Sequence, residues 1–185
     1  MSLKKAVCSA IAVLCFGSVV AGTANAEVNG SAIGLRLGGG SLLDAELNYQ
    51  AGLGGNRLEV GATFGYESEK INVAVTTITH TTTYLGIVGI YQWHWGIGAV
   101  KGLNWYAGPG AGIGFWSDGY SGSNLSGYKD DSGFYVNVGG QIGIEYNLNA
   151  HKIPLLLSLD VRPMFGLLND DGFGWGAGLG IRYTF

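Results

Sequence analysis

The sequence has few of the features that hold small proteins together covalently or through metal ions. Its two cysteines, Cys8 and Cys15, both precede residue 27, so residues 27–185 can form neither a disulfide nor a cysteine metal site. Proline is scarce, with 3 in 185 residues, and only 12% of residues are charged. No apolar run after residue 26 approaches the ~20 residues of a transmembrane helix. Cross-links and membrane helices are therefore both excluded as the source of stability.

The sequence also lacks a large excess of positive or negative charge, which limits the kinds of partner it could bind. The formal net charge is −3, and it becomes −5 if the segment carrying Lys4 and Lys5 is removed. This balance gives no reason to expect nucleic acid as a partner. Glycine is abundant, with 34 residues, but it follows no collagen period. The length is that of one domain.

Residues 1–26 have the three parts of a cleaved secretory signal peptide. Lys4 and Lys5 form the positive region, residues 6–20 are apolar, and residues 24–26 read Ala-Asn-Ala, a small-residue cleavage site. The alternative is an uncleaved anchor helix, for which the apolar stretch is short. We expect an exported mature chain that begins at Glu27.

The mature chain alternates between apolar and polar residues almost throughout. In the stretch LLDAELNYQAGL, alternate residues from Leu43 to Leu53 are apolar, and those between are mostly polar. Alternation of this length predicts a β-strand. Several expected strands exceed the usual ~5–6 residues and approach the ~9–11 that cross a bilayer with tilt. The eight expected strands are about 30–38, 42–53, 57–67, 81–95, 103–116, 134–148, 153–166 and 173–185.

The connections favour a membrane barrel over a soluble β-sandwich. Those after the second, fourth and sixth strands are short, whereas those after the third and fifth are long and polar. The first connection, around GGGS, is short as well. Short periplasmic turns and longer outer loops are typical of outer-membrane barrels with both termini in the periplasm.

The aromatic residues are sorted by height along these strands. Rings at both membrane interfaces around an aliphatic band are typical of proteins in a lipid bilayer. The predicted outer girdle is Phe64, Tyr66, Phe115, Phe134, Phe165, Phe173 and Trp175. The predicted periplasmic girdle is Tyr49, Tyr91, Trp93, Trp95, Trp105, Tyr146, Tyr183 and Phe185.

The last strand, GFGWGAGLGIRYTF, resembles the C-terminal signature of bacterial outer-membrane proteins. With the signal sequence and the eight amphipathic strands, the whole chain resembles the small outer-membrane β-barrel family that includes OmpA-type and OmpX-type barrels. The resemblance implies an all-β fold, an eight-stranded antiparallel transmembrane up-and-down β-barrel. It also implies that Tyr183 and Phe185 form a signal read by the barrel assembly machinery. The expected surroundings are outer-membrane lipid and lipopolysaccharide, with the protein a monomer.

Charged residues fall on the inward face of these strands. Because an unpaired charge inside a membrane protein costs several kcal/mol, we expect an internal salt-bridge network that plugs the lumen. Inward glycines on the fifth and eighth strands would make room for arginines and tyrosines. The alternative is that the lumen is open as a narrow channel. A wide diffusion pore is not expected, because such pores need ~16–18 strands. The predicted network is Arg36, Asp44, Glu46, Glu59, Glu145, Asp160, Arg162 and Arg182.

Pro109 and Pro163 fit this pattern poorly. Each lacks the backbone N–H that would donate a hydrogen bond inside a predicted strand. A closed barrel has no edge strand in which a proline would leave no hydrogen bond unmade. We therefore expect a β-bulge at one or both prolines, which could reverse the facing of the residues beyond it.

The predicted role is structural or surface-interactive rather than catalytic, with no cofactor and no metal. The outer segments 68–80 and 117–133 are the candidate contacts for an extracellular partner, and the first could continue its strands as a protruding hairpin. We expect acidic outer residues such as Asp118 to be solvent-exposed at the rim of the barrel and not to form a cation site. The alternative from another class is a lipid-modifying enzyme. His80 is the only histidine expected on the outside, and the sequence shows no orienting carboxylate beside it.

Overall fold

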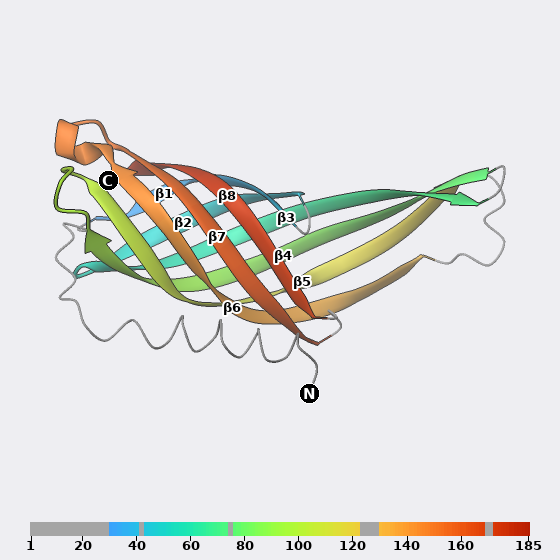
Figure 1. Ribbon diagram of the computed structural model, residues 1–185. Coiled ribbons are helices and arrows are strands. Elements are labelled where there is room, and N and C mark those ends of the chain that lie inside the picture. The colour runs from blue at the N-terminus through green and yellow to red at the C-terminus, as the bar shows by residue number, and fades with distance from the viewer. Residues whose placement is uncertain (1–29, 41–42, 74–75, 123–129, 169–171) are drawn as a thin grey trace.

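The computed structural model describes residues 30–40, 43–73, 76–122, 130–168 and 172–185, and these form a closed antiparallel barrel (Figure 1). Each strand pairs with the next along the chain, and the last pairs with the first. The predicted fold class is confirmed, whereas residues 1–26 lie outside the described part. The strands are β1 (Ala32–Gly40), β2 (Leu43–Leu53), β3 (Asn56–Val73), β4 (Thr76–Gly96), β5 (Leu103–Gly122), β6 (Asp131–Asn147), β7 (Leu155–Leu168) and β8 (Phe173–Thr184).

The barrel closes through a long ladder between β1 and β8. Ala32 is the partner of Thr184 and Gly40 is the partner of Gly176. Two further backbone hydrogen bonds join Ser31 and Phe185, with N···O distances of 3.1 and 2.9 Å. Closure gives every strand a neighbour on both sides within the barrel, which a lipid environment requires.

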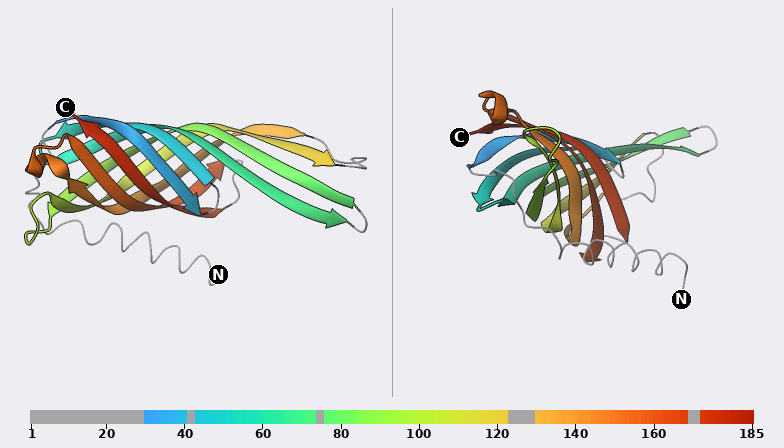
Figure 2. Two further views of the ribbon diagram at one scale, coloured as in Figure 1. Left: turned by 90° about the horizontal axis from the view of Figure 1, so that it is seen from above. Right: turned by 60° about the vertical axis from the view of Figure 1, so that its left-hand side comes forward.

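The strands β3, β4, β5 and β6 extend well beyond the others at one end. Of the predicted loops, residues 68–73, 76–80, 117–122 and 131–133 are strand in the described structure. In the first loop, β-branched residues favour extended backbone. Ladder pairing between β3 and β4 runs as far as Val73 and Thr76. Both views in Figure 2 show this part of the sheet protruding beyond the barrel.

The other end of the barrel has tight connections. Gly54 and Gly55 join β2 to β3, and their φ values of 61° and 104° are those of a two-residue hairpin turn that favours glycine. A short 3-10 helix, η1 (Leu148–His151), joins β6 to β7. The predicted difference between the two ends is found in strand length and not in connection length. Only residues 74–75 lie between β3 and β4, whereas residues 97–102 lie between β4 and β5 at the opposite end.

Neither proline produces the expected β-bulge. The β4–β5 register is the same on both sides of Pro109, and the β7–β8 register is unbroken at Pro163. Each proline instead leaves a local gap of two pairs in one ladder, β4–β5 or β6–β7. The one register shift in β6–β7 falls between Val136 and Asn137. The residues that face the lumen and those that face outward are therefore the ones that the alternation in the sequence predicts.

The barrel is polar inside and apolar outside. Glu59 and His94 are fully buried, whereas Phe115 is 70% and Leu179 66% exposed. In water this arrangement would expose much more apolar surface than a monomer usually does. Among the described residues, no helix has the length and hydropathy needed to cross a membrane.

Candidate functional site

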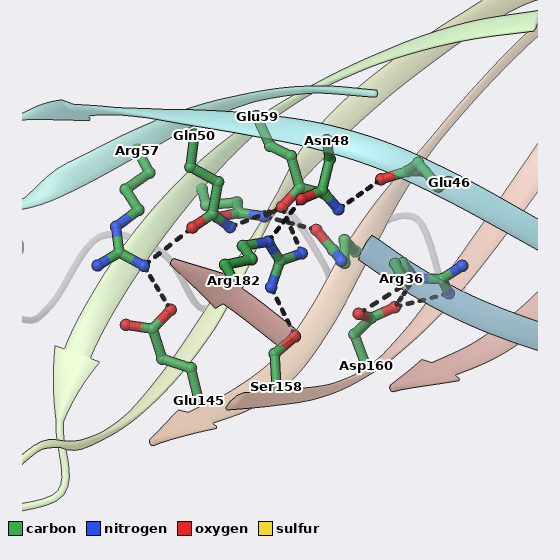
Figure 3. A network of polar contacts seen from close by, with 12 residues as sticks. Arg36, Glu46, Asn48, Gln50, Arg57, Glu59, Glu145, Ser158, Asp160 and Arg182 are labelled. Carbon is green, nitrogen blue, oxygen red and sulfur yellow. Dashed lines mark hydrogen bonds and ion pairs between the residues drawn. The ribbon is translucent and has the colours of Figure 1, made fainter. Parts of the chain in front are cut away.

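The lumen contains the densest set of charged side chains in the described structure. Successive residues of a strand point to opposite faces, so every second residue of each strand enters the lumen. Neighbouring positions on eight strands therefore bring together side chains that are far apart in the sequence. Figure 3 shows this network of polar contacts.

The upper part of the network, toward the protruding strands, is centred on Arg36 of β1. Its Nε and Nη2 donate to Oδ1 of Asp160 at 3.0 and 2.8 Å. Its Nη1 donates to Oδ2 of Asp44 at 3.0 Å. One guanidinium is therefore shared by two carboxylates, in the two-pronged geometry that suits arginine.

The middle of the network is centred on Glu59 of β3. Its Oε1 accepts from Arg162 at 2.5 Å, and its Oε2 accepts from Arg182 at 2.9 Å. Arg162 also donates to Oε2 of Glu46 at 2.5 Å. Arg182 donates further to Oδ1 of Asn48 at 2.8 Å. Charges from four strands, β2, β3, β7 and β8, are thus joined across the lumen.

The lower part contains an ion pair that the sequence pattern only half identifies. Glu145 was predicted as a lumen charge, and its partner is Arg57, whose Nη1 lies 2.7 Å from Oε2 of Glu145. Arg57 was not assigned to the network, although its inward phase on β3 is the same as that of Glu59. Amide side chains continue the network here: Gln50 donates to Glu59 at 2.6 Å, and Gln92 donates to Gln141 at 2.7 Å.

The structure places all eight predicted network residues in contact with a charged or polar partner. Seven are at most 7% exposed, and Asp44 is the exception, with its side chain 23% exposed. Glu59 contacts both Arg162 and Arg182 and so joins arginines from β7 and β8. Buried charges are tolerated only where such partners exist.

Glycines on the lumen wall make room for these long side chains. A Cβ added at Gly178 would lie 2.3 Å from Cζ of Arg36, and one added at Gly180 would lie 2.8 Å from Nη1 of Arg182. A Cβ at Gly143 would lie 2.7 Å from the hydroxyl oxygen of Tyr106. The glycines are therefore the counterpart of the large residues that the narrow lumen contains.

A cavity of about 180 Å³ lies above the network, toward the protruding strands. Arg36, Asp44 and Arg162 lie on its charged side. Tyr84 and Tyr135 also line it, with their rings in an edge-to-face contact at 6.2 Å. Side chains of the network thus fill the lumen below the cavity, whereas the cavity itself is open space.

The predicted outer-girdle residues occupy outward positions near the protruding end. Phe64, Phe115 and Phe134 lie in one row of the sheet, in which Leu85 separates the first two. The rings of Phe165 and Phe173 are 5.1 Å apart. Tyr66 and Trp175 are also exposed, at 46% and 51%.

The predicted periplasmic-girdle residues occupy outward positions near the opposite end. The rings of Trp95 and Trp105 stack at 4.1 Å, and those of Tyr183 and Phe185 lie 6.4 Å apart. The other members make further local contacts. They are Tyr91 with Trp93, Tyr49 with Ser31, and Tyr146 with His151.

The structure corrects the expectation that His80 has no carboxylate beside it. Its Nε2 lies 3.4 Å from Oδ2 of Asp118 on β5, and its ring stacks on Tyr120 at 4.7 Å. Strand pairing created this contact between residues 38 positions apart, which no sequence motif shows. Thr82 donates to the other Asp118 oxygen at 2.6 Å. Within the described chain, Nε2 of His80 has no hydrogen-bond partner, so no nucleophile is bonded to that nitrogen.

Comparison with known proteins supports the fold. No protein-family profile matches the chain, and no similar sequence is found among curated proteins. A major outer membrane protein from Thermus thermophilus has a TM-score of 0.52 at 15% identity, over 84% of this chain and 99% of that one. Neisserial surface protein A has a TM-score of 0.50 at 11% identity, over 84% and 94%. This chain therefore has the fold of small outer-membrane β-barrels, as its sequence suggested.

This arrangement can seal a lumen, hold one small molecule above the seal and present a sheet beyond the barrel. Among the described residues, no cluster of three or more histidines, cysteines and carboxylates is placed to hold a metal ion. His94 is buried against Tyr106 in the lumen, whereas His151 is exposed and contacts Tyr146.

Proposed function

We propose that this protein is an integral outer-membrane β-barrel whose function is structural and surface-interactive. The observation that carries the proposal is the inverted distribution of polarity on a closed barrel. Charged side chains are buried inside, while leucine, isoleucine and aromatic side chains are exposed outside. Lipid is the solvent that stabilises this distribution.

The proposed export and orientation follow from the ends of the chain. Residues 1–26 serve as a cleaved signal peptide, and Tyr183 and Phe185 are the residues that the barrel assembly machinery reads. With short connections in the periplasm, the protruding strands lie outside the cell. The mature protein is a monomer surrounded by outer-membrane lipid and lipopolysaccharide, and its aromatic rings lie at the two interfaces.

The proposed state of the lumen is sealed. Four arginines pair with five carboxylates across it, at distances of 2.5 to 3.0 Å. Water and ions would have to displace these pairs in order to pass. The alternative, a narrow channel, would require a continuous path past these ion pairs.

Conductance across a planar bilayer tests the seal. The refolded protein should give no steady ion current above that of the bare membrane. The matched control is Arg162→Ala, which removes a guanidinium that spans the middle of the lumen and should raise the current. A steady current through the unaltered protein would show that the lumen is a channel.

The proposed interaction surface is the protruding sheet of β3 to β6. Among the described residues, β3 has no partner on its β2 side beyond Tyr66, so its backbone from residue 67 to 73 offers an unpaired edge. Such edges bind extended segments of other proteins by strand addition. Attachment of expressing cells to a host or bacterial surface is the corresponding activity.

Shortening the hairpin tests this role. Replacing residues 70–79 with Asn-Gly keeps the pair between Glu69 and His80 and removes the unpaired edge above it. Expressing cells should then attach as weakly as cells without the gene. The control carries Glu67→Gln and leaves the hairpin intact. Equal attachment by the shortened and unaltered proteins would refute the proposed surface.

A lipid-modifying enzyme is the second candidate, and the His80–Asp118 pair is the observation in its favour. The pair brings together two of the three residue types in a nucleophile, base and orienter set, at a distance of 3.4 Å. Mass spectra of lipid A from cells with and without the gene test it. We expect identical spectra, whereas a mass change lost in His80→Ala would establish catalysis.

A further inference from the structure

The upper lumen contains one more negative charge than it can neutralise internally. Above the Arg57–Glu145 pair, four carboxylates face three guanidiniums among the described residues. The carboxylates are Asp44, Glu46, Glu59 and Asp160, and the guanidiniums are those of Arg36, Arg162 and Arg182. No described lysine enters the lumen, so one carboxylate has no cation of its own.

The excess charge belongs to Asp44. Arg36 gives Asp160 two hydrogen bonds and Asp44 only one, through Nη1 at 3.0 Å. The second oxygen of Asp44, Oδ1, is covered by surrounding atoms and has no hydrogen-bond partner. Asp44 is also the one carboxylate of the four that is in part exposed, with 23% of its side chain accessible. The unneutralised charge therefore lies at the border of the network and not deep within it.

The cavity of about 180 Å³ is lined by this carboxylate and also by Arg36 and Arg162. Both arginines are paired with carboxylates of the network, Arg36 with Asp160 and Arg162 with Glu46 and Glu59. Tyr84 and Tyr135 form part of its wall, and aromatic rings attract cations through their faces. Tyr135 lies against the glycine wall, because a Cβ at Gly86 would be 2.3 Å from its hydroxyl oxygen. A cavity of about 150 Å³ holds a benzene molecule, so this one accommodates a ligand of about that size.

We infer that this cavity binds a small organic monocation, an alkylammonium ion, with Asp44 as its counter-ion. The tyrosine rings suit an alkylated ammonium better than a bare inorganic ion, which needs several oxygen ligands. The described chain has no cluster of acidic and histidine side chains that would hold a metal ion. Glu67 and Asp118, on the protruding strands above, add negative potential that attracts cations toward the cavity.

Two glycines allow a matched test of the cavity. A Cβ at Gly176, which lines the cavity, would meet only the carbonyl oxygen of Gly39, at 3.8 Å. Gly176→Leu should therefore fill the space without a clash. A Cβ at Gly89 would meet nothing within 4 Å. Because odd-numbered residues of β4 face outward, Gly89→Leu adds the same side chain outside the barrel.

The experiment titrates the refolded, isotopically labelled mature protein with tetramethylammonium chloride and follows its amide NMR signals. Signals around Asp44, Tyr84 and Tyr135 should shift and saturate at about millimolar concentration. Asp44→Asn should weaken binding about tenfold or more, Gly176→Leu should abolish it, and Gly89→Leu should leave it unchanged. Retained dispersion of the remaining signals shows that each variant is folded.

The neutral control ligand is tert-butanol, and sodium chloride is the inorganic control. Both should leave the same signals unshifted at equal concentration. Absence of saturation with tetramethylammonium, or equal binding of tert-butanol, would overturn the inference. So would equal shifts with sodium, which would make the site one for inorganic cations. If Asp44→Asn does not fold, the two glycine variants and the neutral ligand still decide the outcome.

Discussion

Arg36 and Asp160 form a two-pronged ion pair inside the barrel although 124 residues separate them in the sequence. The arginine comes from β1 and the aspartate from β7, so the pair forms only once the last strands have joined the first. Both side chains are almost completely buried. The contact therefore depends on closure of the barrel and also stabilises the closed form.

Removing one member of this pair should be strongly destabilising. Arg36→Met leaves Asp160 buried without its main partner, which should lower the free energy of unfolding by about 3–5 kcal/mol. Urea unfolding in lipid vesicles measures this. The double variant Arg36→Met, Asp160→Leu should regain at least about 1 kcal/mol, since no unpaired charge remains. Equal stability of Arg36→Met and the unaltered protein would contradict the structure.

Gly178 should tolerate no side chain of ordinary size. A Cβ there would lie 2.3 Å from Cζ of Arg36, so Gly178→Val should cost about 1–3 kcal/mol in the same unfolding assay. Gly89→Val serves as the control, because its Cβ would meet nothing within 4 Å. A similar loss in both variants would point to strand conformation and not to the contact with Arg36.

A charge on the outward face should be costly only at membrane depth. Leu159 lies on β7 and is 48% exposed, yet Leu159→Arg should destabilise the protein by about 2–4 kcal/mol. Val100 is similarly exposed, at 46%, but lies in the connection between β4 and β5. Val100→Arg should cost less than about 1 kcal/mol. If both substitutions were harmless in vesicles, Leu159 would not face lipid.

The protruding hairpin should be dispensable for folding. Its ladder pairs from residue 70 to 79 join only β3 to β4, apart from two contacts of β4 with β5. Replacing this segment with Asn-Gly should change the free energy of unfolding by less than about 1 kcal/mol. Failure of the shortened chain to refold would show that the hairpin takes part in barrel closure.

The strand pattern was predictable because side-chain facing has a period of two. All eight strands, the inward charges and the outward rings follow from that period. Strand ends in the outer segments were not predictable, because polar threonine-rich residues suit both strand and loop. Pro109 and Pro163 were expected to shift the register, but each interrupts a single ladder and leaves the facing unchanged.

The partners within the lumen were less predictable than its residues. The alternation along β3 is enough to place Arg57 inside the barrel. Its pairing with Glu145 depends on how the two side chains extend across the lumen. The same holds for Glu59, which two arginines share. The His80–Asp118 contact arises from the β4–β5 register, which is fixed by the whole sheet and by no local motif.

Site-directed labelling along β7 tests the central claim, that alternate residues face lipid outside and a polar lumen inside. Residues 27–185 lack cysteine, so in a protein made from these residues single cysteines can be placed at Leu157, Ser158, Leu159 and Asp160 without background. A spin label at each position in vesicles reports collisions with oxygen, which concentrates in lipid. We predict high oxygen accessibility at Leu157 and Leu159 and low accessibility at Ser158 and Asp160. Equal accessibility at all four positions would contradict the barrel in the membrane.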